Sequence, residues 1–290
     1  MPRMLLWLVS VSALTAQSAV EPSALRARVL SLIKASGAEV AVAFRTIDGR
    51  QELLIDPDTT VHAASTMKLP VMIELFRQAE AGMLSLDDPL PIRNVFHSIV
   101  DGSEYPLDVG DDSDAEVYKA IGGTLTLRQL AEAMITVSSN FAANLLIERL
   151  GVENIRRTVT KIGADGMQVL RGVEDAKAFE KGMNNTTTAR GLLVLLEKLA
   201  NGPVVSTKAD ADMIAMLSRQ TFNDAIPAGV PAGTRIAHKT GTITKIHHDA
   251  AIVFAPRPYV LVVLVRGLQE EKESAALIAA ISREVWGAVR

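Results

Sequence analysis

Apolar residues follow two different spacings along this 290-residue chain. In several segments they recur every three or four residues, which predicts helices with one buried face. In others they alternate with polar residues or form short continuous runs, which predicts strands. The predicted helices cover residues 23–37, a helix opening near residue 65, and residues 126–135, 141–150, 152–162, 186–200, 207–219 and 271–289. The predicted strands cover residues 39–47, 51–55, 235–243, 249–254 and 259–265.

The order of these elements predicts the domain organisation. Strands near both ends around a helical middle indicate an α/β lobe that both termini build together. We therefore expect an α/β lobe from residues 20–62 and 205–290, and an inserted all-helical lobe from residues 63–204. A site between two such lobes would lie in the cleft that separates them.

Composition and charge narrow the possible functions. With 48% hydrophobic and 22% charged residues, the chain has an ordinary globular composition rather than a disordered one. A formal charge of -3 gives no basic footprint, so we expect no nucleic-acid partner. The chain has no cysteine, which excludes disulfides and thiolate metal sites.

The first 19 residues have the pattern of a secretory signal peptide. Arg3 provides the positive start, a short apolar run follows, and small residues near Ala16 offer a cleavage site. The apolar run is too short to span a membrane. The alternative is a buried N-terminal helix. We expect a secreted or periplasmic protein that has no stable membrane insertion and is a monomer.

The main candidate for chemistry is Ser65 with Lys68, three residues later at the start of an apolar helix. This spacing puts the hydroxyl and the amine on one helix face, and a neighbouring amine can activate a serine as a nucleophile. Burial would lower the pKa of the lysine towards the neutral form that a base needs. Ser31 and Lys34 have the same spacing, but we interpret them as the solvated face of a helix.

Two further motifs follow in order: Ser138-Ser139-Asn140 after a helical run, and Lys239-Thr240-Gly241-Thr242 in a predicted strand. With these three motifs the chain resembles the penicillin-recognising serine hydrolases, and among them the class A β-lactamases. The resemblance covers nearly the whole chain after residue 19. It implies an α/β (α+β) fold in which an antiparallel sheet, flanked by helices from both termini, carries the inserted helical lobe.

The resemblance also implies the residues of an acyl-transfer site. Ser65 would be the nucleophile, and its own N–H would form an oxyanion hole with that of Thr242. Lys68 would be the acylation base or part of a proton relay, and Ser138 would carry the proton to the leaving nitrogen. Asn140 would orient Lys68 and the amide carbonyl of the substrate.

The third motif would bind the substrate. Lys239 and Thr240 would hold its carboxylate, and Gly241 and Thr242 complete the motif on the same strand. Lys245 could add positive charge, although an exposed lysine explains that residue equally well. The resemblance implies no cofactor and no metal ion.

The chain departs from the class A pattern at the step that releases the acyl group. Glu174 is the best candidate for the general base, but Ala178 stands where the family has an asparagine. The alternatives are Asp175, Glu180 and a site without a base for this step. Ser139 replaces the usual aspartate of the second motif, which is a milder change. The residues therefore support acylation more strongly than deacylation.

Other polar residues have simpler explanations. Residues 82–123 form a polar stretch, longer than in the family, that we expect to roof the cleft and to affect selectivity rather than stability. Its acidic cluster is read as a solvated loop. Adjacent histidines on a strand point to opposite faces, which suits one metal ion poorly, and the remaining histidines read as structural. The cluster and histidines concerned are Asp108, Asp111, Asp112 and Asp114, and His62, His97, His238, His247 and His248.

Three functions fit the sequence. The leading hypothesis is a serine hydrolase that cleaves the β-lactam amide through an acyl-serine. The second is a DD-peptidase or esterase that acts on peptides resembling those of peptidoglycan. The third is a binding or sensor module that a β-lactam acylates without turnover.

Overall fold

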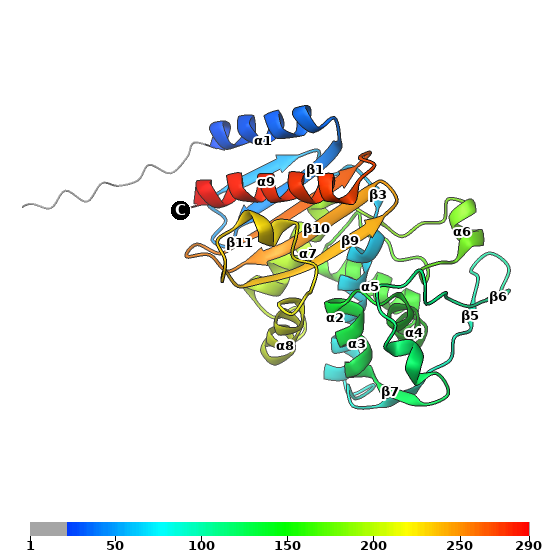
Figure 1. Cartoon of the computed structure of the whole chain (residues 1–290). Coiled ribbons are helices and arrows are strands. Elements are labelled where there is room, and N and C mark those ends of the chain that lie inside the picture. The colour runs from blue at the N-terminus through cyan, green and yellow to red at the C-terminus, as the bar shows by residue number, and fades with distance from the viewer. Residues whose placement is uncertain (1–21, 290) are drawn as a thin grey trace, which may run out of the picture.

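A five-stranded antiparallel sheet forms the frame of the molecule in the computed structural model, which describes residues 22–289 (Figure 1). The strand order is β2-β1-β11-β10-β9. The central strand carries the continuous apolar run, and its residues from Tyr259 to Val265 are buried on both faces of the sheet. The bounds are β1 Glu39–Thr46, β2 Glu52–Ile55, β9 Ile236–Ile243, β10 Ile246–Val253 and β11 Tyr259–Arg266.

Helices cover both faces of this sheet. Helices α1 (Pro22–Ser36) and α9 (Glu271–Val289) lie side by side on one face, while α7 (Ala189–Asn201) packs on the other (Figure 1). Side chains of β1 alternate between the two resulting layers, as the pleat of a strand requires. Val42 and Phe44 pack under α1 and α9, whereas Ala41 and Ala43 face the larger core on the side of α7.

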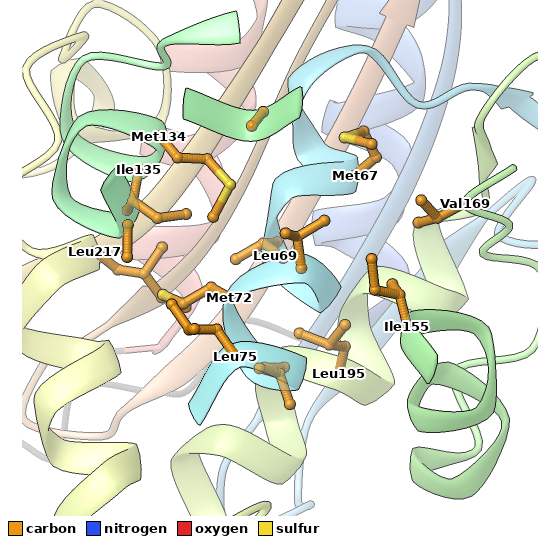
Figure 2. Packing of buried hydrophobic residues seen from close by; sticks show 14 of the residues in the cluster. Met67, Leu69, Met72, Leu75, Met134, Ile135, Ile155, Val169, Leu195 and Leu217 are labelled. Carbon is orange, nitrogen blue, oxygen red and sulfur yellow. The ribbon is translucent and has the colours of Figure 1, made fainter. Parts of the chain in front are cut away.

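Helix α2 runs through the centre of the larger core. Its first nine residues are all buried. Seven of these nine residues are apolar, and the two exceptions are Lys68 and Glu74. The neighbouring helices α3, α5, α7 and α8 pack around it with Met134, Ile155, Leu195 and Leu217, respectively (Figure 2). The bounds of the helices not yet given are α2 Lys68–Glu80, α3 Leu127–Thr136, α4 Asn140–Leu150, α5 Val152–Ile162, α6 Ala176–Glu180 and α8 Thr207–Leu217.

Short ladders and 3₁₀ turns complete the fold. Residues 186–187, expected to open a helix, form a strand instead, because Thr188 caps α7 by accepting a hydrogen bond from Gly191 N. The ladders pair β3 (Val61–His62) with β8 (Thr186–Thr187), β4 (Pro89–Pro91) with β7 (Thr124–Thr126) and β5 (Phe96–His97) with β6 (Glu104–Tyr105). The 3₁₀ turns are η1 Ala64–Met67, η2 Val117–Ala120 and η3 Ile226–Gly229.

The predicted fold class is confirmed: an antiparallel sheet carries helices from both termini, and a largely helical part is inserted between its strands. Thr126 and Gln129 form a capping box at the start of α3. The division into two lobes stays a prediction, since one core cluster contains residues of both. The expected signal peptide lies outside the described residues. Within residues 22–289 no helix is long and apolar enough to cross a bilayer.

Residues 82–123 differ from the solvated loop expected for them. Ile92, Phe96, Leu107 and Val117 are all less than 5% exposed and belong to the main core cluster. Asp114, in the acidic cluster, is also buried. The segment is polar on average, yet it inserts one apolar side chain every few residues and is therefore packed against the helices.

Candidate active site

Ser65 lies on the 3₁₀ turn η1, which runs directly into α2. Ala64, just before it, has a φ of 45°, a conformation that costs a non-glycine residue of order 1–3 kcal/mol. The N–H of Ala64 donates to His62 Nδ1 at 3.0 Å, which helps to hold the turn. Side chains three residues apart eclipse on such a turn. This spacing places Ser65 and Lys68 on one face of the turn and of the helix that follows it.

The edge strand β9 passes close to this turn. A Cβ added at Gly241 would lie 2.9 Å from Ser65 N and 3.0 Å from Thr66 N, closer than real Cβ contacts allow. Glycine at this position thus permits the strand backbone to approach the N–H groups of the serine turn. Because β9 is an edge strand, its outer backbone groups have no neighbouring strand to bind. The arrangement brings the Thr242 segment beside Ser65.

Lys68 is fully buried and donates three hydrogen bonds to the turn between α3 and α4. Its Nζ lies 2.5 Å from Ser138 O, 2.8 Å from Asn140 Oδ1 and 3.3 Å from Ser138 Oγ. Burial lowers the pKa of Lys68 to about 7, although Asp112 and Glu174 oppose this by their negative charge. Near neutral pH the amine is therefore partly unprotonated and able to accept a proton.

Ser138 stands between two lysines. Its φ is 61°, a second strained position, and its Oγ accepts from Lys239 Nζ at 3.0 Å as well as from Lys68. Lys239 is also fully buried and donates to Thr240 O at 2.9 Å. Burial lowers the pKa of Lys239 well below its ordinary value, and the nearby Lys68 lowers it further. The structure thus joins the first, second and third motifs through one hydroxyl.

Glu174 reaches the same site from the loop of residues 171–185. Asn140 Nδ2 donates to Glu174 Oε1 at 2.8 Å, while Asn140 Oδ1 accepts from Lys68. One amide therefore bridges the two candidate bases, and each of its ends has a defined partner. Burial raises the pKa of Glu174, Asp112 and Asp111 raise it further, and the bond from Asn140 opposes the rise. Glu174 has a φ of 62°.

The structure separates Glu174 from the two alternative bases. Asp175 is buried, and its carboxylate accepts from Ser98 Oγ at 2.8 Å, Ile99 N at 3.0 Å and Ala178 N at 3.1 Å. These donors occupy Asp175 as an anchor of the loop. Glu180 is an exposed residue at the end of α6. Ala178 is fully buried, so no amide stands at the position where the family has one.

Sequence reasoning missed several residues that hold this loop. The side-chain amide of Asn144 binds both backbone groups of Val173, with Val173 N donating at 2.6 Å and Val173 O accepting at 3.0 Å. Asn185 closes the base of the loop through Leu170 N and the backbone of Arg171. A buried asparagine is a signal for such backbone pairing. The partner loop, however, cannot be read from local pattern.

A cleft passes over these residues in two adjoining parts, of about 580 Å³ and 240 Å³. Ser65, Asn140 and Thr242 line both parts, Glu174 lines the larger, and Ser138 and Thr240 line the smaller. The lining carries more carboxylates than cations. The carboxylates are those of Asp108, Asp111, Glu174, Asp175, Asp224 and Glu271. The cation is the guanidinium of Arg171.

The remaining candidates lie elsewhere or have ordinary partners. Ser31 and Lys34 are exposed on α1, as expected. Lys245 is exposed with a φ of 59° at the turn between β9 and β10, outside the cleft lining. His248 binds the backbone of His62 and Val265, whereas His247 lines the smaller part of the cleft.

Two other histidines have carboxylate neighbours. His238 binds buried Asp249 at 3.0 Å, and His97 lies near Glu104 on the surface. In the part of the chain that the structure describes, no group of three or more His, Asp or Glu side chains is arranged to hold a metal ion.

Comparison with known proteins gives one consistent result. A model of the Beta-lactamase enzyme family matches residues 24–289. A beta-lactamase of Bacillus licheniformis is 31% identical over 185 residues, which are 59% of this chain and 58% of that enzyme. The structure of PBP-A is similar with a TM-score of 0.80 at 25% identity, over 92% of this chain and 96% of that one. An ancestral class A beta-lactamase gives 0.79 at 25% identity, over 91% and 99%.

Proposed function

The chain belongs to the beta-lactamase enzyme family, and we propose that it hydrolyses the amide bond of β-lactams through an acyl-enzyme on Ser65. One observation carries the proposal. The hydroxyl of Ser138 accepts from both Lys68 and Lys239 beside the cleft that Ser65 lines. This arrangement can take a proton from a nucleophile and deliver it to a leaving nitrogen.

Acylation begins with neutral Lys68, which takes the proton of Ser65 Oγ. The oxygen attacks the lactam carbonyl carbon, and the N–H groups of Ser65 and Thr242 stabilise the negative charge that develops on the carbonyl oxygen. The C–N bond then breaks, and the nitrogen receives the Ser138 hydroxyl proton, which the protonated Lys68 replaces. Lys68 thereby returns to its neutral state.

Deacylation requires a second base. Glu174 takes a proton from a water molecule as this water attacks the acyl carbon, and the proton returns to Ser65 Oγ when the ester bond breaks. The bond from Asn140 Nδ2 at 2.8 Å holds the carboxylate in place for this step. Partial burial raises the pKa of Glu174, and a carboxylate of higher pKa is a stronger base towards water.

Substrate binding falls mainly to β9. Thr240 and Thr242 line the cleft and offer hydroxyls to a carboxylate, while Gly241 lets the strand approach Ser65. Lys239 is buried behind Thr240, so it acts on the substrate chiefly through Ser138. No cofactor takes part in these steps.

A second candidate function is a penicillin-binding protein or sensor that forms the acyl-enzyme and releases it slowly. Buried Ala178 supports this alternative, since it stands where the family has the asparagine that helps to hold the hydrolytic water. The similar protein PBP-A supports it as well: a mutant of PBP-A was solved as an acyl-enzyme complex with penicillin G. A peptidase or esterase acting on peptidoglycan-like peptides would use the same acylation residues.

The cellular setting is part of the proposal. Residues 1–19 direct secretion or export to the periplasm, where the mature protein acts as a monomer. Export would place it where it protects a bacterium from β-lactams.

Nitrocefin hydrolysis tests the proposal, with intact-protein mass spectrometry beside it. We expect sustained turnover by the wild type, and neither turnover nor a covalent adduct for Ser65→Ala, whose fold is checked by circular dichroism. The matched control is Ser31→Ala, which removes the other Ser-x-x-Lys serine and should leave both results unchanged. Labelling that survives Ser65→Ala would refute the assignment of the nucleophile. A stable wild-type adduct without turnover would favour the penicillin-binding alternative.

A further inference from the structure

The second motif lacks the carboxylate that the family places between its serine and its asparagine. Ser139 stands there instead, fully buried, and its hydroxyl accepts from Ala142 N at 3.2 Å. This bond caps only one of the free N–H groups at the start of α4. The N–H groups of Asn140 and Phe141 need another acceptor.

Asp112 supplies that acceptor from the packed segment of residues 82–123. Its Oδ1 accepts from Asn140 N at 2.9 Å and its Oδ2 from Phe141 N at 2.8 Å. A carboxylate that accepts two backbone N–H bonds at a helix N-terminus gains from both hydrogen bonds and the helix dipole. The same Oδ2 lies 3.5 Å from Ser139 Oγ. Asp112 thus occupies the turn where the motif itself has no charge.

The position of Asp112 is itself fixed by neighbouring groups. Tyr118 OH donates to Asp112 Oδ2 at 3.2 Å, and the ring of Tyr118 packs on Phe141 with centroids 4.5 Å apart. The carboxylate is therefore held against α4 by the element that follows it in sequence. An aspartate on an unanchored loop would not have this support.

We propose that Asp112 is a positioning residue of the active site, which holds Ser138 and Asn140 in register with Lys68 and Glu174. The bond to Asn140 N fixes the backbone of the residue whose side chain bridges Lys68 and Glu174. It also stabilises the turn that keeps Ser138 at a φ of 61°. The inference rests on the proposed function for its kinetic consequences, but not for the contacts themselves.

The charge of Asp112 has a second effect, which a purely structural aspartate need not have. It raises the pKa of both Lys68 and Glu174. The other charged groups that face Lys68 are Glu174 and Lys239, and those that face Glu174 are Asp111 and Lys68. Neutralising Asp112 should therefore let Lys68 lose its proton at lower pH.

The test compares Asp112→Asn and Asp112→Ala with Asp114→Asn. Asp114 belongs to the same segment but accepts from Glu116 N and has no hydrogen bond to α4. We expect both Asp112 variants to lower the rate of Ser65 labelling by a fluorescent penicillin by roughly 10- to 100-fold, as for a lost charge-assisted hydrogen bond. The acid limb of that rate should also move to lower pH in Asp112→Asn. Asp114→Asn should change neither.

A rescue variant separates positioning from general stability. Ser139→Asp on the Asp112→Ala background restores a carboxylate at the same turn and should recover most of the labelling rate. The same substitution in the wild type places two carboxylates side by side and should lower the rate. Equal effects of Ser139→Asp on both backgrounds would overturn the proposal.

Amide hydrogen exchange provides a readout that does not need activity. The N–H groups of Asn140 and Phe141 should exchange roughly 10- to 100-fold faster in Asp112→Ala and at the wild-type rate in Asp114→Asn. A wild type that no penicillin labels would refute the proposed function, while faster exchange would still support the contacts of Asp112. Unchanged exchange in a folded Asp112 variant would refute the inference.

Discussion

Lys68 is fully buried and is surrounded by neutral oxygen acceptors rather than by a directly bonded carboxylate. An ammonium in such a place loses hydration that its hydrogen bonds only partly replace. The result is a pKa of about 7 in place of 10.5, with burial as the main cause. Burial of Lys68 thus destabilises the fold, and the same burial lets Lys68 act as a base at neutral pH.

The pH dependence of acylation should follow Lys68. The pKa of Lys68 is about 7, so below this pH the amine is protonated and cannot accept the serine proton. The acylation rate should therefore fall as the pH drops through 7. Rapid-mixing measurements of burst rate with nitrocefin between pH 5 and 9 check this, with circular dichroism to confirm folding at each pH. A rate that stays flat down to pH 5 would make Glu174, rather than Lys68, the acylation base.

Lys239 should contribute to proton transfer through Ser138 more than to binding of the substrate carboxylate. Lys239 is buried outside the cleft lining, and its amine donates to Ser138 Oγ rather than facing the substrate. We expect Lys239→Ala to slow acylation by carboxylate-bearing β-lactams and by neutral esters to a similar extent. Comparison of kcat/KM on the two classes is the measurement. A loss of kcat/KM that is roughly tenfold to a hundredfold larger for the charged substrates would show instead that Lys239 binds the substrate carboxylate directly.

At the scale of elements, residues 82–123 do more than roof the cleft. Ser98 and the N–H of Ile99 bind Asp175 of the loop that carries Glu174, and Tyr105 OH donates to Val173 O at 3.2 Å. The segment therefore holds the Glu174 loop on one side and α4 on the other. Its buried side chains contradict the expectation that it could be shortened with little effect on stability.

Phe96→Ala tests the packing of this segment. Phe96 is 2% exposed and contacts Phe141 with ring centroids 6.0 Å apart. Its truncation should lower the free energy of unfolding by about 3–5 kcal/mol, measured by urea denaturation. Val95→Ala, at a neighbouring position that is 44% exposed, is the matched control and should change it by less than about 1 kcal/mol. Equal effects of the two substitutions would mean that the segment is not a packed element.

The long regular elements and the three motifs could be predicted from the sequence because their signals are local. Strand alternation, helical spacing and the capping box at Thr126 need only neighbouring residues. The ladders of two or three residues could not be predicted, since their pairing depends on distant partners. For the same reason no local pattern indicates that Asp112 binds α4 or that Asp175 anchors the Glu174 loop. Both contacts join segments that are far apart along the chain.

At the scale of the whole molecule, the site lies where an edge strand meets the central helix and two loops. β9 supplies the third motif, the turn before α2 supplies Ser65, and the turn before α4 supplies Ser138 and Asn140. Among residues 22–289, three of the five non-glycine residues with positive φ are Ala64, Ser138 and Glu174. Each costs the fold of order 1–3 kcal/mol, which the buried core around α2 has to offset.

The release of the acyl group is the step on which the account depends most. Glu174→Gln removes the base that activates water but keeps an amide that can still contact Asn140. It should acylate at a near-normal rate and then stall, because removing a general base costs roughly 100- to 10,000-fold in its own step. The wild type, which has Ala178 in place of the partner asparagine, should turn over slowly.

The most direct measurement is time-resolved mass spectrometry of the wild type and Glu174→Gln after mixing with a penicillin. The account predicts a Ser65 adduct that disappears in the wild type and persists in Glu174→Gln, with equal rates of formation. A mutant adduct that disappears as fast as that of the wild type would show that the base lies elsewhere. A wild-type adduct that persists would contradict the proposed hydrolase.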